Sequence, residues 1–444
     1  MLRGSNLDQS VPGTFFPVEV LSLSQLSDEL ATGDDSTDVR PRLLILSASA
    51  GFGHFRCGQP EERACHLLGY NWNISHIDIL DYTNPLFKTM YSKMYIDMMT
   101  KMPEVLGWLY DQLDKPEKNR KNKLAFDRLH VGPFIRLIKQ IRPDVVFCTH
   151  SLPAEIISWL NGRKKNPLRI RQTIIITDFD AHALWLCENY EKYFVALEET
   201  RVHLEQIGVP AGKVAVTGIP IDPVFSDLPD RRAMRMKYGL NPDTSTILTS
   251  AGGYGVGRVE KVIALLMQLK QKTQVIAICG KNEALKERLE NVAAAQDEHS
   301  NVSLLVVGYT SAMHEYMAAS DLIIGKPGGM TMCESLASGL VWVVVNPIPG
   351  QEVRNSDHLL EEGCAIKCNN LPALPFKVDR LLADSDRLAR MQQNSLRLAR
   401  PDAARQIATS LKQIIDQYPQ TAIPQAGLSS TSMDGWSSPR TFPS

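Results

Sequence analysis

The sequence predicts an α/β protein made of two doubly wound domains. Short apolar runs alternate with helical stretches, first in one half of the chain and again in the other. This is the pattern of parallel strands buried between layers of helices. Glycine-rich turns follow some of these runs, at the sheet edge where such folds bind ligands. The length of 444 residues also favours two domains over one core.

The composition is that of an ordinary globular protein, with 44% hydrophobic and 22% charged residues and a net charge of −1. A net charge this close to zero does not indicate general nucleic-acid binding. The eight cysteines show neither metal-site spacing nor a disulfide framework, which favours a reducing, cytoplasmic setting. There is no signal-peptide pattern and no apolar run of about 18 residues, so we expect any membrane contact to be peripheral.

The first domain is predicted at 41–222, after a variable segment at 1–40. A linker is predicted at 223–244, where prolines and charges interrupt the pattern. Strands of this domain are expected at 42–46, 74–80, 145–148, 173–177 and 193–196.

The second domain is predicted at 245–400. Its strands are expected at 246–250, 274–278, 302–307, 321–324 and 340–345. A helical pattern over 387–418 closes the ordered part, with 401–420 as a separate C-terminal helix segment and 421–444 as a disordered tail. Two similar halves imply a ligand cleft between them.

Two glycine turns in the second domain can hold an anion. The stretch 326–334, Lys-Pro-Gly-Gly-Met-Thr-Met-Cys-Glu, joins a strand to a helix expected at 331–338. Backbone N–H groups at a helix N-terminus are free to face a phosphate. A second loop, 251–257, matches neither the dinucleotide fingerprint nor the P-loop, and by itself it is equally a tight turn. Together the loops indicate a diphosphate held by backbone amides, with no metal required.

Three side chains near these turns have alternative interpretations. Glu334 follows Thr331 in the form of a capping box, so locally it either caps its own helix or reaches ribose hydroxyls. Glu352, next to Gln351, either hydrogen-bonds to a sugar or simply lies in a solvated loop. His54 follows a strand and a glycine turn, and is either a general base or a structural histidine.

The segment 85–110 stands apart from the strand pattern. It carries Met and aromatic residues at helical spacing, interspersed with lysines. Such residues are usually part of a core. The same mixture suits a helix that lies in a membrane interface or lines a groove for a lipid acceptor.

In their order along the chain, these motifs resemble those of the family 28 glycosyltransferases of the GT-B fold. The resemblance is to the branch of diacylglycerol glucosyltransferases and monogalactosyldiacylglycerol synthases. The likeness runs from about 42 to 400. It rests on Glu334 and on the segments 47–54, 177–185, 194–200, 217–222, 251–257, 313–329 and 349–355.

The resemblance implies that the domain at 41–222 faces the acceptor and the membrane and that the domain at 245–400 binds the UDP-sugar donor. It also implies roles for individual residues. His54 takes the position of the base that deprotonates the acceptor hydroxyl, and Asp180, His182 and Trp185 face the cleft from the acceptor side. The donor would be bound by Gly308 and Tyr309 at the uracil, by Gly252, Gly253 and Gly329 near the diphosphate, by Glu334 at the ribose, and by Gln351 and Glu352 at the hexose. Thr331 and Asn355 are also expected among the donor-binding residues.

The resemblance also implies a reaction. A hexose passes from a UDP-sugar to a lipid hydroxyl, that of diacylglycerol, with inversion and without a metal or a cofactor besides the donor substrate. The protein would associate peripherally with the inner face of a membrane. Other acceptors, or a regulator that binds UDP-sugar without catalysis, are the alternatives.

The chain departs from the family pattern after its first glycine turn. The family continues as G-H-x-x-A-A, whereas here Arg56 and Cys57 follow His54 at a short distance. Pro60 comes next and is expected to disturb a helix unless it lies in the first turn. This departure concerns the acceptor half, because the donor half keeps its motifs better.

Overall fold

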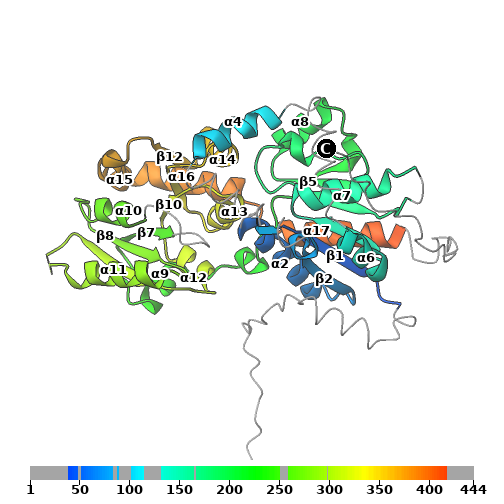
Figure 1. Ribbon diagram of the computed structural model, residues 1–444. Coiled ribbons are helices and arrows are strands. Elements are labelled where there is room, and N and C mark those ends of the chain that lie inside the picture. The colour runs from blue at the N-terminus through cyan, green and yellow to red at the C-terminus, as the bar shows by residue number, and fades with distance from the viewer. Residues whose placement is uncertain are drawn as a thin grey trace, which may run out of the picture.

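The computed structural model describes residues 39–48, 52–83, 88–89, 102–114, 132–164, 167–250, 259–297 and 299–417, and of residues 52–55 and 103 it describes the backbone alone. Two parallel six-stranded sheets stand side by side, each flanked by helices (Figure 1). This architecture confirms the predicted α/β class with two doubly wound domains.

The amino-terminal sheet has the order β2-β1-β3-β4-β5-β6. Its strands are β1 (Arg42–Ser47), β2 (Asn73–Asp78), β3 (Val145–Cys148), β4 (Gln172–Ile175), β5 (Lys192–Val195) and β6 (Val214–Val216). The helices are α2 (Phe52–Leu67), α4 (Pro103–Leu113), α6 (Gly132–Ile141), α7 (Ser151–Asn161) and α8 (Glu198–Gln206), with short 3-10 turns η1 (Ile79–Tyr82), η2 (Ala183–Trp185) and η3 (Ala211–Lys213).

The carboxy-terminal sheet has the order β12-β11-β10-β7-β8-β9. Its strands are β7 (Ser245–Ser250), β8 (Thr273–Ile278), β9 (Val302–Val307), β10 (Leu322–Gly325), β11 (Val341–Val345) and β12 (Ala365–Cys368). The helices and 3-10 turns from the crossover onward are η4 (Pro223–Ser226), α9 (Arg231–Lys237), α10 (Val259–Leu266), α11 (Glu283–Ala294), α12 (Met313–Ala318), α13 (Gly329–Ala337), α14 (Gln351–Glu361), η5 (Leu371–Ala373), α15 (Leu374–Leu382), α16 (Ser385–Leu398) and α17 (Ala403–Gln417).

The expected strands are found with small shifts at their ends, and two further strands appear. β6 is an edge strand of the amino-terminal sheet and β12 is an edge strand of the carboxy-terminal sheet, and they are three and four residues long. An edge strand is covered on fewer sides than a central one. Its sequence therefore lacks the sustained apolar run by which the central strands were recognised.

The segment expected as a linker contains α9, which is docked on the carboxy-terminal domain. The buried guanidinium of Arg235 pairs with Asp321 at 2.5 Å and donates to the carbonyl of Ala319 at 2.8 Å. Asp321 directly precedes β10. This cation from α9 therefore anchors the segment to the start of a central strand.

Two helix predictions were wrong. The pattern over 387–418 is not one helix but α16 and α17, with a break at 399–402 that contains Pro401, a residue that disfavours continuation of a helix. Pro60 lies inside α2, well beyond its first turn, and the helix continues through it. The missing N–H of Pro60 therefore does not end this helix.

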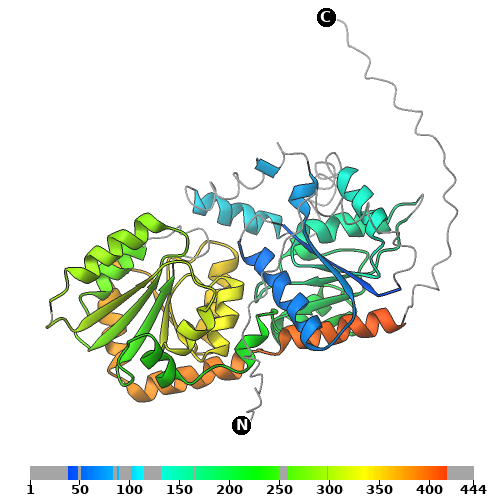
Figure 2. The ribbon, with the colours of Figure 1, turned by 90° about the horizontal axis from the view of Figure 1, so that it is seen from below.

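The last helix returns to the first domain. After the break, α17 packs on α2, and Figure 2 shows it in red-orange along the amino-terminal domain. Its buried face includes Ile407 and Leu411. The chain thus crosses between the domains twice, once before η4 and once after α16.

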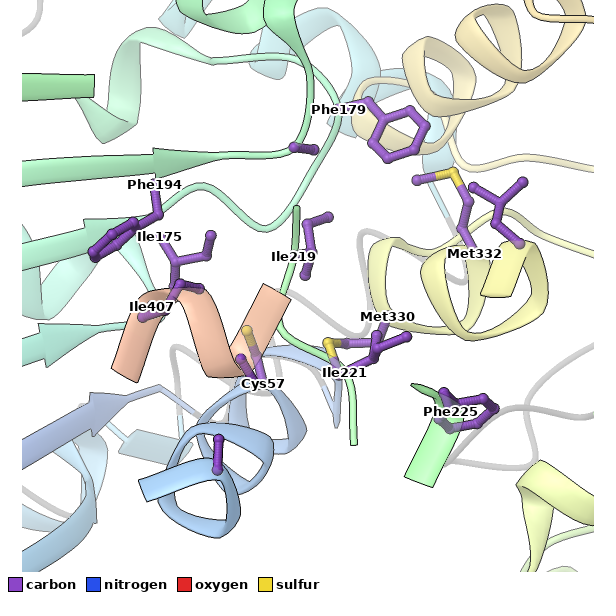
Figure 3. Close-up of a cluster of buried hydrophobic side chains, with 14 of the residues drawn as sticks. Cys57, Ile175, Phe179, Phe194, Ile219, Ile221, Phe225, Met330, Met332 and Ile407 are labelled. Carbon is purple, nitrogen blue, oxygen red and sulfur yellow. The ribbon is translucent and has the colours of Figure 1, made fainter. Parts of the chain in front are cut away.

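The two domains share one apolar core. A cluster of buried side chains extends from Phe194 of β5 across Ile219 to Met330 of α13, and takes in Ile407 of α17 (Figure 3). Two further clusters fill the outer layers, one in each domain.

In the described part of the chain, no helix has the length and apolarity needed to cross a bilayer.

Candidate active site between the two domains

The helix after the glycine turn starts earlier than expected. Gly328 is its N-cap, Gly329 is its first residue, and no side chain caps it. Thr331 and Glu334 are therefore inside α13, and the capping-box interpretation of Glu334 was wrong. Thr331 is half-buried in the first turn, where the helix leaves N–H groups unpaired.

Gly329 is required by a contact with the other domain. A Cβ built on this residue would lie 2.0 Å from the carbonyl oxygen of Thr177, far inside any van der Waals contact. Thr177 belongs to the loop after β4. The glycine turn of the carboxy-terminal domain is thus pressed against the loop after β4 of the amino-terminal domain.

Glu334 is buried at this interface. Its Oε1 accepts a hydrogen bond from Nη2 of Arg56 in α2 at 2.6 Å. Burial raises the pKa of Glu334, and the Arg56 guanidinium opposes this shift. The carboxyl group that the resemblance assigns to the ribose is therefore held by a cation from the opposite domain.

The two motifs of the donor domain converge at Glu352. Its Oε2 accepts from the backbone N–H of Ile348 at 2.7 Å. Its Oε1 lies 4.0 Å from the position that a Cβ of Gly328 would take. Burial raises the pKa of Glu352 to about 7, while the Ile348 N–H and the charge of Lys326 oppose the shift.

Asn355 joins the domains through its side-chain amide. The Oδ1 atom accepts from the N–H of Phe179 at 2.9 Å, and Nδ2 donates to Asp178 and to the carbonyl of Pro327, both at 3.1 Å. The amide is fully buried. Asn355, which was expected to help bind the donor, therefore fixes the loop after β4 to the glycine turn.

Asp178 was not singled out in the sequence, although it lies in the same interface. Burial raises its pKa to about 6, and the hydrogen bond from Asn355 opposes that shift. Its position within the segment 177–185 was the only sequence signal available. A carboxylate next to a strand end becomes informative only when its partner across the interface is known.

Helix α4 covers the turn before α14. A Cβ on Gly107 would meet Cβ of Pro349 at 2.5 Å, and Gly350, with a φ of +99°, lies against the ring of Tyr110. Figure 1 shows α4 near α14 and α8, between the two domains. The described part of the segment 85–110 thus packs on the donor domain along one face, while Met90, Met94, Met98 and Met99 fall outside the described residues.

A charged pair holds α4 in this place. Arg354 of α14 donates to Asp114 at 2.8 Å, and its guanidinium carbon lies 5.2 Å from the centroid of the Tyr110 ring. Asp180 is also within 3.7 Å of this guanidinium. Neither Arg354 nor Tyr110 was proposed as a site residue, because no local pattern indicates that α4 meets α14.

The residues predicted on the acceptor side, Asp180, His182 and Trp185, differ in their contacts. Nδ1 of His182 accepts from the N–H of Leu184 at 3.0 Å, so the ring proton is on Nε2, which lies 2.8 Å from the Tyr110 carbonyl oxygen. His182 therefore ties the acceptor loop to α4. Trp185 is buried in the outer core of the domain.

Asp180 is part of an ion pair between domains. Its carboxylate is 3.7 Å from Nε2 of His358, and Glu199 is 3.5 Å from Nδ1 of the same ring. His358 lowers the pKa of Asp180, and Asp180 in turn raises the pKa of His358. Glu199, His358 and Glu361 also form a group whose ligand atoms lie within 4.8 Å, but two of the three are exposed and His358 is already engaged.

The remaining predicted residues are described only in part. Gly308 follows β9, and Tyr309 is 68% exposed with Nζ of Lys281 5.4 Å from its ring centroid. Gln351 is the half-buried first residue of α14. Gly252 and Gly253 lie outside the described residues. His54 falls in the first turn of α2, but its side chain is outside the description.

Substitution of Gly329 by Ala tests the contact between the domains. The added methyl group cannot fit beside the Thr177 carbonyl, so the backbone must shift, at a cost of about 1–3 kcal/mol. We expect thermal unfolding several degrees lower. Gly132→Ala is the control, since a Cβ there has nothing within 4 Å. Equal melting temperatures for the two variants would contradict the contact.

Comparison with known proteins agrees with this geometry. Residues 64–221 match the family model of monogalactosyldiacylglycerol (MGDG) synthase, and 256–407 match that of the glycosyltransferase family 28 C-terminal domain. The chain is 30% identical over 353 residues to a processive diacylglycerol beta-glucosyltransferase of Bacillus subtilis, covering 80% of this chain and 90% of that protein. A Staphylococcus haemolyticus protein of the same description is 30% identical over 325 residues, covering 71% of this chain and 78% of that protein.

Solved structures support the fold. Acinetobacter baumannii MurG superposes with a TM-score of 0.52 at 15% identity, over 84% of this chain and 99% of that one. Staphylococcus aureus MnaA, solved with UDP, superposes with a TM-score of 0.52 at 13% identity, over 85% of this chain and 98% of that one. The two-domain architecture is the GT-B fold. By its sequence relatives, the chain belongs to the family 28 glycosyltransferases, in the branch that holds the monogalactosyldiacylglycerol synthases and the processive diacylglycerol glucosyltransferases.

Proposed function

We propose that this protein moves a hexose from a UDP-sugar to the hydroxyl group of a lipid, diacylglycerol, with inversion at the anomeric carbon. The observation that carries the proposal is the meeting of two donor motifs, because a carboxylate oxygen of Glu352 lies against Gly328 at the start of α13. The relatives named diacylglycerol glucosyltransferases support the acceptor class.

The donor would lie along the carboxyl edge of the second sheet. The N-terminus of α13 favours a diphosphate through its N–H groups and helix dipole, and no metal is needed for this. Glu334 would bind the ribose, while Gln351 and Glu352 would orient the hexose. Gly308, Tyr309, Gly252 and Gly253 complete the proposed donor site, with Thr331 and Asn355 beside it.

The reaction needs one base and a stabilised leaving group. His54, at the start of α2, would remove the proton from the lipid hydroxyl as its oxygen attacks the anomeric carbon and the bond to UDP breaks. The charge that develops on UDP would be stabilised at the start of α13. Direct displacement of this kind inverts the anomeric centre.

The acceptor would arrive from a membrane surface beside α4. Met102, Val105 and Trp108 are exposed at a spacing of three, on one side of this helix, while Leu106 is buried. An exposed tryptophan among apolar residues suits a membrane interface. In this proposal the enzyme associates peripherally with the inner face of a membrane.

A panel of radiolabelled UDP-hexoses with diacylglycerol in mixed micelles tests the proposed reaction. We expect label in a lipid product for at least one donor. His54→Ala should lower kcat by about 10²–10⁴-fold while leaving the affinity for UDP unchanged. Donor binding without turnover on any lipid would instead indicate a regulator, and product from a soluble acceptor alone would replace the lipid.

The pH dependence of the reaction tests the role of Glu352. Because its pKa is raised to about 7, the carboxylate becomes ionised only as the pH rises through that value. An ionised carboxylate accepts more strongly from sugar hydroxyls, so kcat/KM should rise through about pH 7.

Glu352→Gln should remove this rise and lower kcat/KM by about 10–100-fold. Asp178→Asn is the control, since it removes the neighbouring carboxyl group whose pKa is about 6 and leaves Glu352 in place. Retention of the full rise near pH 7 in Glu352→Gln would assign it to another group.

Flotation with anionic liposomes tests the membrane contact. Trp108→Glu places a charge on the exposed side of α4 and should reduce the bound fraction several-fold. Phe376→Glu on α15 is a matched control, because Phe376 is as exposed as Trp108, at 63%. Equal flotation of the two variants would remove α4 from the membrane contact.

A further inference from the structure

The carboxylate of Glu334 is inaccessible in the donor-free chain. Its side chain is 2% exposed, whereas that of Arg56, which pairs with it, is 41% exposed. The second oxygen, Oε2, is buried and has no hydrogen-bond partner within the described part of the chain. A ribose cannot reach either oxygen while α2 and α13 keep this arrangement.

The surroundings explain why the carboxylate is covered. Met330 lies four residues before Glu334, on the same side of α13. Its side chain belongs to the apolar cluster that includes Cys57 and Ile221 of the other domain (Figure 3). The side of α13 that carries Glu334 therefore packs on α2.

We propose that the Arg56–Glu334 pair is a latch on the ribose subsite, which the UDP part of the donor displaces. This inference rests on the proposed function, because that function assigns the ribose to Glu334. The latch makes Arg56 a positioning residue, since it acts on the donor through Glu334. It also couples donor binding to the separation of α2 from α13.

Hydrogen bonding favours the exchange. A buried carboxylate oxygen without a donor is costly, and Arg56 satisfies only Oε1. A ribose diol carries two O–H donors, one for each oxygen. The half-exposed guanidinium of Arg56 can return to water at small cost once it is released.

The latch predicts the sign of a mutational effect. The free energy needed to open it is subtracted from donor binding, so a chain without the latch binds the donor more tightly. A residue that contacts the donor directly would show the opposite, because its removal weakens binding. Arg56→Met distinguishes the two.

Titration of the full-length chain with UDP alone is the test, at about pH 8.5 so that carboxyl groups favour the ionised form. We expect the Kd of Arg56→Met to be about 3–10-fold lower than that of the wild type. Arg56→Lys keeps a cation and should restore the wild-type value. Arg56→Gln gives a second uncharged variant with the same expectation.

Arg63→Met is the matched control. Arg63 also lies on α2, pairs with Asp222 directly before η4 at 2.7 Å, and has an exposure of 39%, close to that of Arg56. Because its carboxylate partner is Asp222, its loss should leave the UDP affinity within about twofold of the wild type. An equal gain in affinity for this variant would show general loosening and overturn the latch.

A pH series gives a measurement that a general loosening of the contact between α2 and α13 would not change. Without Arg56, burial and the charge of Asp222 raise the pKa of Glu334 with no guanidinium of Arg56 to oppose them, so the proton is lost only at higher pH. The UDP affinity of Arg56→Met should therefore rise with pH over a range in which the wild type has levelled off.

The outcomes separate the two proposals. Equal or weaker UDP binding by Arg56→Met, with normal thermal unfolding, overturns the latch and leaves the proposed function standing. No UDP binding by the wild type or any variant overturns the proposed function, and the latch with it.

Discussion

The close approach of Gly329 to the Thr177 carbonyl sets the distance between the two domains. No side chain fits there, because a Cβ would be 2.0 Å from the oxygen. The amide of Asn355 fixes the same place by bonding both Phe179 and Pro327. Around these polar contacts the buried apolar cluster continues from one domain into the other, so its burial favours the docked arrangement. The donor motifs, the acceptor loop and α2 meet only because this contact is so short.

Helix α14 connects the parts of the site. Its first turn carries Glu352 of the proposed hexose subsite, and its body presents Arg354 and His358 to the acceptor domain. Through Arg354 the same helix holds α4, whose other side exposes Trp108. The proposed membrane contact of α4 and the proposed hexose subsite at the start of α14 therefore lie on two sides of one charged network.

Most of the fold was predictable because its strands are buried on both faces and so carry continuous apolar runs. The failures have local causes. β6 and β12 are short edge strands, and the break at Pro401 lay within an unbroken helical pattern. Glu334 was open to two interpretations because T-x-x-E is a capping box only when Thr is the N-cap, and the backbone of Gly328 and Gly329 decided otherwise. The site residues that were missed, Asp178 and Arg354, lie inside or beside recognised motifs but have no motif of their own.

The sequence by itself determined the two α/β halves, the order of the glycine turns and the family, since these depend on periodicity and on neighbours along the chain. The tertiary structure decided the partners. Arg56 meets Glu334 across 278 positions, Phe179 meets Asn355 across 176, and His182 meets the Tyr110 carbonyl across 72. The first two bonds form because the two domains are packed against each other, and the third forms because α4 packs on the loop after β4. A burial energy shared by many apolar side chains has no local signature at the residues it brings into contact.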